Sequence, residues 1–103
     1  KGFQKGFCVR LSRPHEYHDP IWKLISLLDT FFGVTCGCNA YLHPPGSTGF
    51  SAHYNDVDSF VLSTEGKTRW RVFNSTYELP LDPGPDIPES ELPTPIVDET
   101  LLP

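Results

Sequence analysis

The middle third of this chain places the strongest constraint on its fold, because polar residues recur there at every second position. Asn39, Tyr41 and His43 alternate with small or apolar residues. This period of two is typical of a strand with one polar face. His53 and Asn55 are also two residues apart, so an extended backbone projects both side chains to the same side. The pattern predicts a β-sheet face that lines a site.

Hydrophobic spacing predicts the remaining elements. Alternation of apolar residues predicts strands over residues 7–11, 34–42, 51–63 and 67–73. Apolar residues recur at helical spacing between Asp19 and Gly33, with Asp19 as the expected N-cap and Pro20 at the first helical position. Glu65-Gly66 predicts a hairpin that joins the last two strands. We therefore expect one helix and a mostly antiparallel sheet.

The segment over residues 80–103 differs from the rest in composition. It holds seven of the eleven prolines and several carboxylates, and it has no basic residue. Proline-rich, acidic segments favour extended loops over regular elements. We therefore predict an extended loop that crosses a surface.

Three motifs in the middle of the chain resemble the JmjC domain of the ribosomal oxygenases, the family of bifunctional lysine-specific demethylases and histidyl-hydroxylases. The family carries Asn-x-Tyr-x-Thr-Pro, then Gly-(Phe/Leu)-x-x-His-Tyr-Asp-Asp, then Glu-Gly-x-Lys-x-Trp-Arg. This chain follows that order with matching gaps. The matching residues are Asn39, Tyr41, Pro44, Gly49, Phe50, His53, Tyr54, Asp56, Glu65, Gly66, Trp70 and Arg71.

The resemblance implies a fold that is mainly β with one helix and forms part of a double-stranded β-helix, the cupin-like JmjC barrel. Residues 1–103 would be the N-terminal part of the domain. Within it, residues 1–38 would form the leading strand and helix, residues 39–79 the barrel strands, and residues 80–103 the Pro-rich acidic loop. We expect the barrel to be truncated before its closing strands, because the family continues into a strand with a distal histidine.

The resemblance also implies two small-molecule partners, Fe(II) and the cosubstrate 2-oxoglutarate. It places His53 and Asn55 at the metal positions, where the family carries His-x-Asp. Thr68 stands where the family's Lys holds 2-oxoglutarate, and Tyr41 and Asn39 are expected to line the cosubstrate pocket. An amide is neutral and a weaker ligand than a carboxylate, and a hydroxyl cannot pair with a carboxylate as an ammonium does. Weakened binding of metal and cosubstrate is the expected result.

Other interpretations of the same residues stay open. His53 is compatible with a half-buried strand histidine that is hydrogen-bonded to its neighbours, and Tyr41 with a barrel-core aromatic residue. Asp56 and Asp58 could replace Asn55 as a carboxylate ligand. Both lie at odd offsets from His53, however, and so need a bulge to reach the same face.

Composition restricts the class of protein. The net charge of −5 and the eight basic residues argue against direct nucleic-acid binding, and no apolar run predicts a membrane span. Three cysteines, an odd count, fit a reduced intracellular protein. They lack the paired Cys-x-x-Cys spacing of a strong zinc signal, so we interpret them as small buried residues.

The resemblance implies an Fe(II)- and 2-oxoglutarate-dependent oxygenase. Its partner would be a protein substrate, with histidine hydroxylated in a ribosomal protein or lysine demethylated in a histone. A nuclear or nucleolar location and a homodimer of the full-length protein are further expectations. The alternative is a catalytically impaired relative that acts as a binding or dimerisation module, and Asn55 and Thr68 are its evidence. A cupin-like domain that uses another metal or none is a third interpretation.

Overall fold

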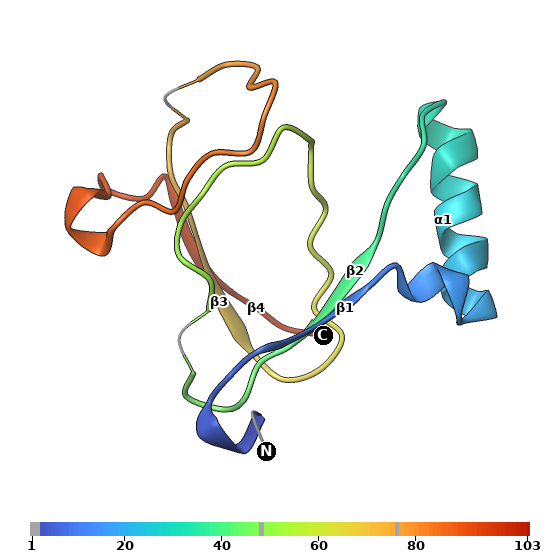
Figure 1. The fold of residues 1–103 in the computed structure, drawn as a ribbon, viewed down its shortest axis with the longest axis horizontal. Coiled ribbons are helices and arrows are strands. Elements are labelled where there is room, and N and C mark those ends of the chain that lie inside the picture. The colour runs from blue at the N-terminus through green and yellow to red at the C-terminus, as the bar shows by residue number, and fades with distance from the viewer. Residues whose placement is uncertain (1–2, 48, 76) are drawn as a thin grey trace. The chain divides into compact units, whose positions relative to one another are not determined.

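The computed structural model describes residues 3–47, 49–75 and 77–103. The chain divides into two compact units, Lys1–Gly49 and Phe50–Pro103. Each unit contains one two-stranded antiparallel sheet (Figure 1). Among the described residues there is a single α-helix and the remaining regular structure is mostly strand, which agrees with the predicted fold class.

The first unit is built on a pair of strands that are distant in sequence. β1 (Val9–Ser12) pairs antiparallel with β2 (Asn39–Leu42), and the Arg13 N–H extends the ladder by donating to the Cys38 carbonyl at 3.0 Å. β2 is shorter than the strand predicted over residues 34–42. The reason is that Arg13 adopts a left-handed conformation, with φ of 54°, and this turns its backbone away from the ladder.

The helix α1 (Asp19–Phe32) lies between these strands in the chain. The N-cap is His18, so the prediction that Asp19 caps the helix is wrong. Asp19 instead places its negative charge in the first turn, where the helix dipole is positive. Gly33 ends the helix as predicted: it adopts a positive φ of 69°, and its N–H donates to the Asp29 carbonyl at 2.9 Å.

Burial in the first unit is greatest where α1 contacts a short turn. Pro14 of that turn and Ile25 of α1 are buried.

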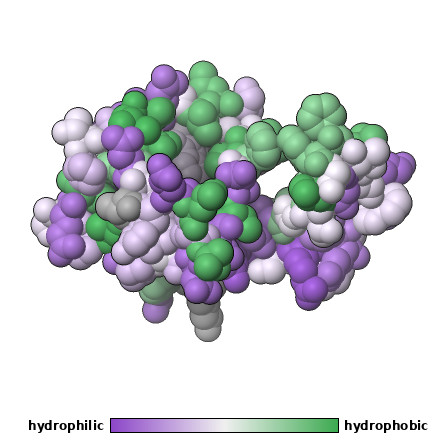
Figure 2. All heavy atoms as spheres, turned by 90° about the horizontal axis from the view of Figure 1, so that it is seen from above, coloured by the Kyte–Doolittle hydropathy of each residue, from purple (hydrophilic) through white to green (hydrophobic). Residues whose placement is uncertain are grey.

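The three cysteines are only half-buried, which corrects the prediction of small buried residues, because they lie at the ends of β1 and β2 or in the loop after α1. Figure 2 shows large apolar side chains at the surface on the face that it draws. The short 3-10 turns of the chain are η1 (Phe3–Lys5), η2 (Pro14–Glu16) and, in the second unit, η3 (Glu89–Glu91).

The second unit pairs β3 (Thr68–Val72) with β4 (Val97–Leu101). The register sets Thr68 opposite Leu101, and the strands run antiparallel. The predicted hairpin between residues 51–63 and 67–73 is therefore wrong, because the partner of β3 comes from the C-terminal segment. The prediction that residues 80–103 form only a loop is wrong for the same reason.

Two ion pairs join β3 to the C-terminal segment. Arg69 donates from Nε and Nη2 to the Asp98 carboxylate, with both distances at 2.6 Å. Arg71 donates to the Glu89 carboxylate in the same bidentate way. Bidentate guanidinium–carboxylate pairs give geometric specificity as well as energy. The acidic composition that indicated a loop thus supplies the partners of the β3 arginines.

Residues 51–63 form no regular strand, although one was predicted there. They make one isolated antiparallel bridge, between Ala52 and Ile87. The Ile87 N–H donates to the Ala52 carbonyl at 2.7 Å, and the Gly84 N–H donates to the Tyr54 carbonyl at 2.9 Å. Gly84 lies so close to the Tyr54 ring that a Cβ there would overlap ring atoms. These contacts hold the backbone on either side of His53.

No helix in the described ranges is long and apolar enough to cross a membrane.

Candidate metal and cosubstrate site

His53 is held in the tautomer that a metal ligand needs. Its Nδ1 lies 2.8 Å from the Ser51 carbonyl oxygen. Because a carbonyl oxygen only accepts hydrogen bonds, Nδ1 carries the proton and Nε2 keeps the lone pair with which a neutral imidazole binds metals. The bond fits the hydrogen-bonded histidine of the alternative interpretation, but His53 is exposed and lies in no strand, so the half-buried strand position expected there is wrong.

A carboxylate that sequence reasoning missed lies beside His53. Asp86 Oδ1 is 3.9 Å from His53 Nδ1. It comes from the Pro-rich segment, which the bonds to Ala52 and Tyr54 bring alongside. No spacing pattern links Asp86 to His53, and the only signal was the acidic composition of its segment. Because Asp86 approaches the protonated nitrogen, it can orient the ring but is not placed to share a metal with Nε2.

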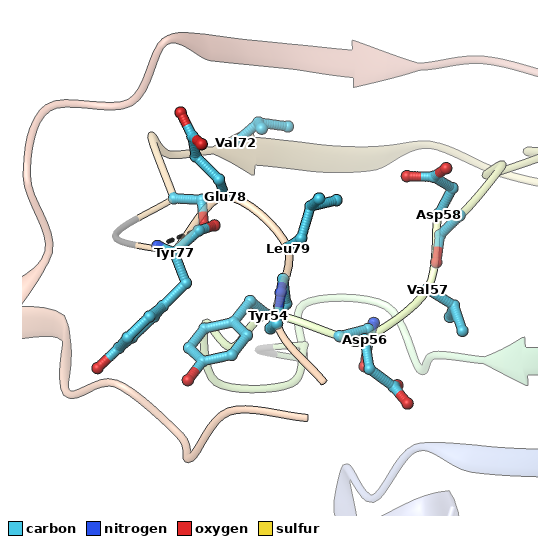
Figure 3. Close-up of a pocket in the computed structure, with 12 residues that line it drawn as sticks. Tyr54, Asp56, Val57, Asp58, Val72, Tyr77, Glu78 and Leu79 are labelled. Atoms are coloured by element: carbon cyan, nitrogen blue, oxygen red, sulfur yellow. Dashed lines mark hydrogen bonds between the residues drawn. The ribbon is translucent and has the colours of Figure 1, made fainter. Parts of the chain in front are cut away.

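Asn55 lines a pocket of the second unit together with Asp56 and Asp58 (Figure 3). Figure 3 shows the carboxylates of these two aspartates pointing in different directions. The Tyr54 ring lies 5.5 Å from the ring of Tyr77, centroid to centroid, in the same pocket. The described lining residues do not include His53. The structure therefore gives no support to a replacement of Asn55 by either aspartate.

Thr68 is half-buried at the first position of β3. Side chains alternate along the strand, so Thr68 and Trp70 share one face while Arg69 and Arg71 share the other. Both arginines are exposed and bound to carboxylates, so their charges face away from the Thr68 side. The hydrogen bond from Arg69 lowers the pKa of the Asp98 carboxyl.

Asn39 and Tyr41 lie in the first unit, on β2. The Tyr41 ring stacks with the ring of His43, the residue after β2, at 6.4 Å between centroids and 16° between planes, so these two alternate residues project to the same side. Asn39 faces Ser12 across the ladder. The convergence of these residues with His53 and the second unit on one pocket stays a prediction.

The donors in the described ranges do not complete a ferrous site. A non-haem iron oxygenase holds Fe(II) with two imidazoles and one carboxylate. Of the two expected ligands, His53 offers Nε2, whereas Asn55 offers a neutral amide oxygen. Within residues 3–47, 49–75 and 77–103, no group of three or more His, Cys, Asp or Glu side chains could hold a metal ion. His53 fits the expected metal, and Asn55 does not.

Comparison with known proteins gives matches over nearly the whole chain. The family model of the JmjC domain matches residues 10–103. The bifunctional lysine-specific demethylase and histidyl-hydroxylase NO66 of Drosophila pseudoobscura pseudoobscura is 41% identical over 101 residues, which cover 98% of this chain and 11% of the relative. Ribosomal oxygenase 1 of Homo sapiens is 36% identical over 104 residues, covering 98% and 16%. Ribosomal oxygenase 1 of Danio rerio is 34% identical over 102 residues, covering 96% and 19%.

The chain spans less than a fifth of the length of each of these relatives. The match nevertheless includes both units, from β1 to β4. It also confirms the cupin-like fold class that the motifs predicted. The chain belongs to the JmjC domain family, and its relatives are the ribosomal oxygenases.

Proposed function

We propose that the full-length protein is an Fe(II)- and 2-oxoglutarate-dependent oxygenase of the ribosomal oxygenase type, acting on a histidine or a lysine of a protein substrate. The observation that carries this proposal is the family match over nearly the whole chain, with His53 in the ligand-competent tautomer. Names of the matched relatives include lysine-specific demethylase and histidyl-hydroxylase. A nuclear or nucleolar location and a homodimer belong to the same proposal.

A second candidate function follows from Asn55 and Thr68. At these positions the chain offers a neutral amide and a hydroxyl where the resemblance expects a carboxylate and an ammonium. Loss of the carboxylate removes the negative charge that offsets the metal, and loss of the ammonium removes the partner of the cosubstrate carboxylate. A catalytically impaired relative would keep the fold as a binding or dimerisation module.

Release of succinate distinguishes the two functions. The full-length protein is incubated with Fe(II) and 2-oxoglutarate, and succinate is measured against a reaction without iron. The oxygenase proposal expects iron-dependent succinate release that His53→Ala abolishes. His18→Ala is the matched control, because His18 lies at the start of α1 and its side chain makes no capping bond. Wild-type protein that releases no succinate while remaining folded would favour the impaired relative.

A further inference from the structure

A thiol and an imidazole meet at the end of the β1–β2 ladder. Val9 pairs with Leu42, so the next residues outward stand opposite each other across the two strands. These are Cys8 and His43, and Cys8 Sγ lies 2.7 Å from His43 Nδ1. This distance is within the hydrogen-bonding reach of a nucleophile and its base. Neither residue belongs to the expected metal or cosubstrate positions.

The pair is held by regular structure and is open to small molecules. The β1–β2 ladder fixes the backbone next to each residue. The His43 ring is further oriented by stacking with the Tyr41 ring. Cys8 and His43 are both half-buried, so part of each side chain stays accessible. A reactive thiol needs this combination of a fixed base and partial exposure.

We propose that Cys8 and His43 form a nucleophilic thiol site that reacts with low-molecular-weight disulfides. The imidazole accepts the thiol proton while Cys8 Sγ attacks one sulfur of the incoming disulfide. A new S–S bond forms as the original S–S bond breaks, and the departing sulfur takes the proton from His43. The Cys8 thiol is oxidised and the incoming disulfide is reduced. The products are a mixed disulfide on Cys8 and one small thiol.

Cys36 provides an internal comparison in the same unit. It is half-buried like Cys8, but its neighbour is a carboxylate, because its backbone N–H donates to Asp29 Oδ1 at 2.6 Å. Burial raises the pKa of the Cys36 thiol, and the Asp29 carboxylate raises it further. A raised pKa leaves less thiolate, which is the attacking species. The two thiols thus have matched exposure and opposite neighbours.

Reaction with glutathione disulfide tests the proposal. The reduced full-length protein is mixed with glutathione disulfide and quenched with acid at intervals, and glutathionylated peptides are quantified by mass spectrometry. Cys8 is expected to react at least about tenfold faster than Cys36, which is less than the roughly hundredfold that a positioned base typically contributes at minimum. His43→Gln is expected to remove this advantage and to leave the Cys36 rate unchanged. His18→Gln is the matched control and should change neither rate.

Two outcomes would overturn the proposal. One is a Cys8 rate no greater than that of Cys36 in the native protein. The other is a Cys8 rate that His43→Gln leaves unaltered. Should His43→Gln unfold the first unit, the wild-type protein in urea decides instead. In urea the ratio of the Cys8 rate to the Cys36 rate should fall toward one. A ratio that stays high would show that the local sequence causes the reactivity, and would refute a Cys8–His43 pair that depends on the fold.

Discussion

The two units hold their strand pairs together in different ways. The β1–β2 ladder contains no acidic residue, and Arg10 faces Tyr41 across it. The β3–β4 ladder is crossed by a bidentate ion pair between Arg69 and Asp98, and Arg71 of β3 makes a second pair outside the ladder. The second ladder therefore has charge complementarity across it, and the first ladder, with no acidic residue, does not.

The expected site residues divide along the same line. Asn39 and Tyr41, in the first unit, match the family motif. Asn55 and Thr68, which depart from the family at the expected metal and cosubstrate positions, both lie in the second unit. The second unit thus combines the altered site positions with the charge-dependent strand pair. The changes at the expected metal and cosubstrate positions are thus confined to one unit, and correcting them there should have the largest effect.

Correcting both departures should produce the largest change. In the full-length protein, Asn55→Asp restores a charged metal ligand and Thr68→Lys restores a charge partner for 2-oxoglutarate. The lysine alone should contribute on the order of 1.5 to 3 kcal/mol to cosubstrate binding once metal is bound. Metal and cosubstrate bind as one assembly, so turnover of the double variant should exceed the sum of the single variants. Succinate release measures it, with His53→Ala added to the double variant as the inactive control.

Two results would contradict this assignment. Wild-type turnover equal to that of the double variant would show that Asn55 already ligates well enough. A double variant that stays inert toward iron would show that the first unit, or another part of the protein, also departs from the family.

Replacement of one glycine by alanine should cost more stability in the second unit than in the first. A Cβ at Gly84 would overlap the Tyr54 ring, so Gly84→Ala should cost about 1 to 3 kcal/mol through overpacking. Exchange of the Gly84 and Ile87 amides, which hold the backbone around His53, should speed up. Gly37→Ala in the first unit is the matched control, because a Cβ there meets no atom within 4 Å. Equal losses of stability from Gly84→Ala and Gly37→Ala would contradict this difference between the units.

Acid should weaken the β3–β4 ladder before the β1–β2 ladder. Hydrogen bonds from Arg69 and Arg71 lower the pKa of Asp98 below its ordinary value of 3.8 and that of Glu89 below 4.5. The unfolded carboxylates bind protons more readily than the folded ones. The stabilisation that the ionised carboxylates give to the fold is therefore complete above their ordinary pKa values. It is lost as the pH falls through their lower pKa values in the folded protein. Amide exchange measured from pH 5 downward, corrected for intrinsic rates, should show β3–β4 losing protection first.

Salt should give the smallest effect. Raising the ionic strength to about 1 M shortens the screening length to about 3 Å, which weakens exposed ion pairs without removing contact pairs. Protection of the β3–β4 amides should fall slightly and that of β1–β2 should hold. Asp98→Asn should reduce the salt response of β3–β4 and leave the part that depends on the Arg71–Glu89 pair. A salt response of equal size in both ladders would mean that the ion pairs do not set the difference.

Periodicity predicted the elements whose burial or alternation is encoded locally. The α1 helix, its stop at Gly33 and the strand β1 all follow from the spacing of apolar residues. The partner of β3 did not follow, because β4 was interpreted through its acidic, proline-rich surroundings and the charges on Arg69 and Asp98 have no periodic signature. Residues 51–63 alternate as a strand does, but they find only one bridge among the described residues.

Prediction of the candidate site from the sequence was limited in the same way. Motif spacing selected His53 and Asn55, and the structure adds the bond to Ser51 that fixes the imidazole proton. Asp86 and the pairing of Cys8 with His43 depend on contacts between segments far apart in sequence. Such contacts become visible only when strand partners and register are known.

The long separation between paired strands also bears on how the chain folds. Neither sheet is a hairpin: β1 and β2 are divided by α1, and β3 and β4 are divided by the proline-rich segment with η3. Each pairing must therefore close a long loop before its contacts form, which slows folding. Helix formation shortens the first loop in advance, because residues rise only about 1.5 Å each in a helix. The second loop has no such element of comparable length, so during synthesis β3 must wait for its partner strand, and Arg69 for Asp98, until β4 has left the ribosome.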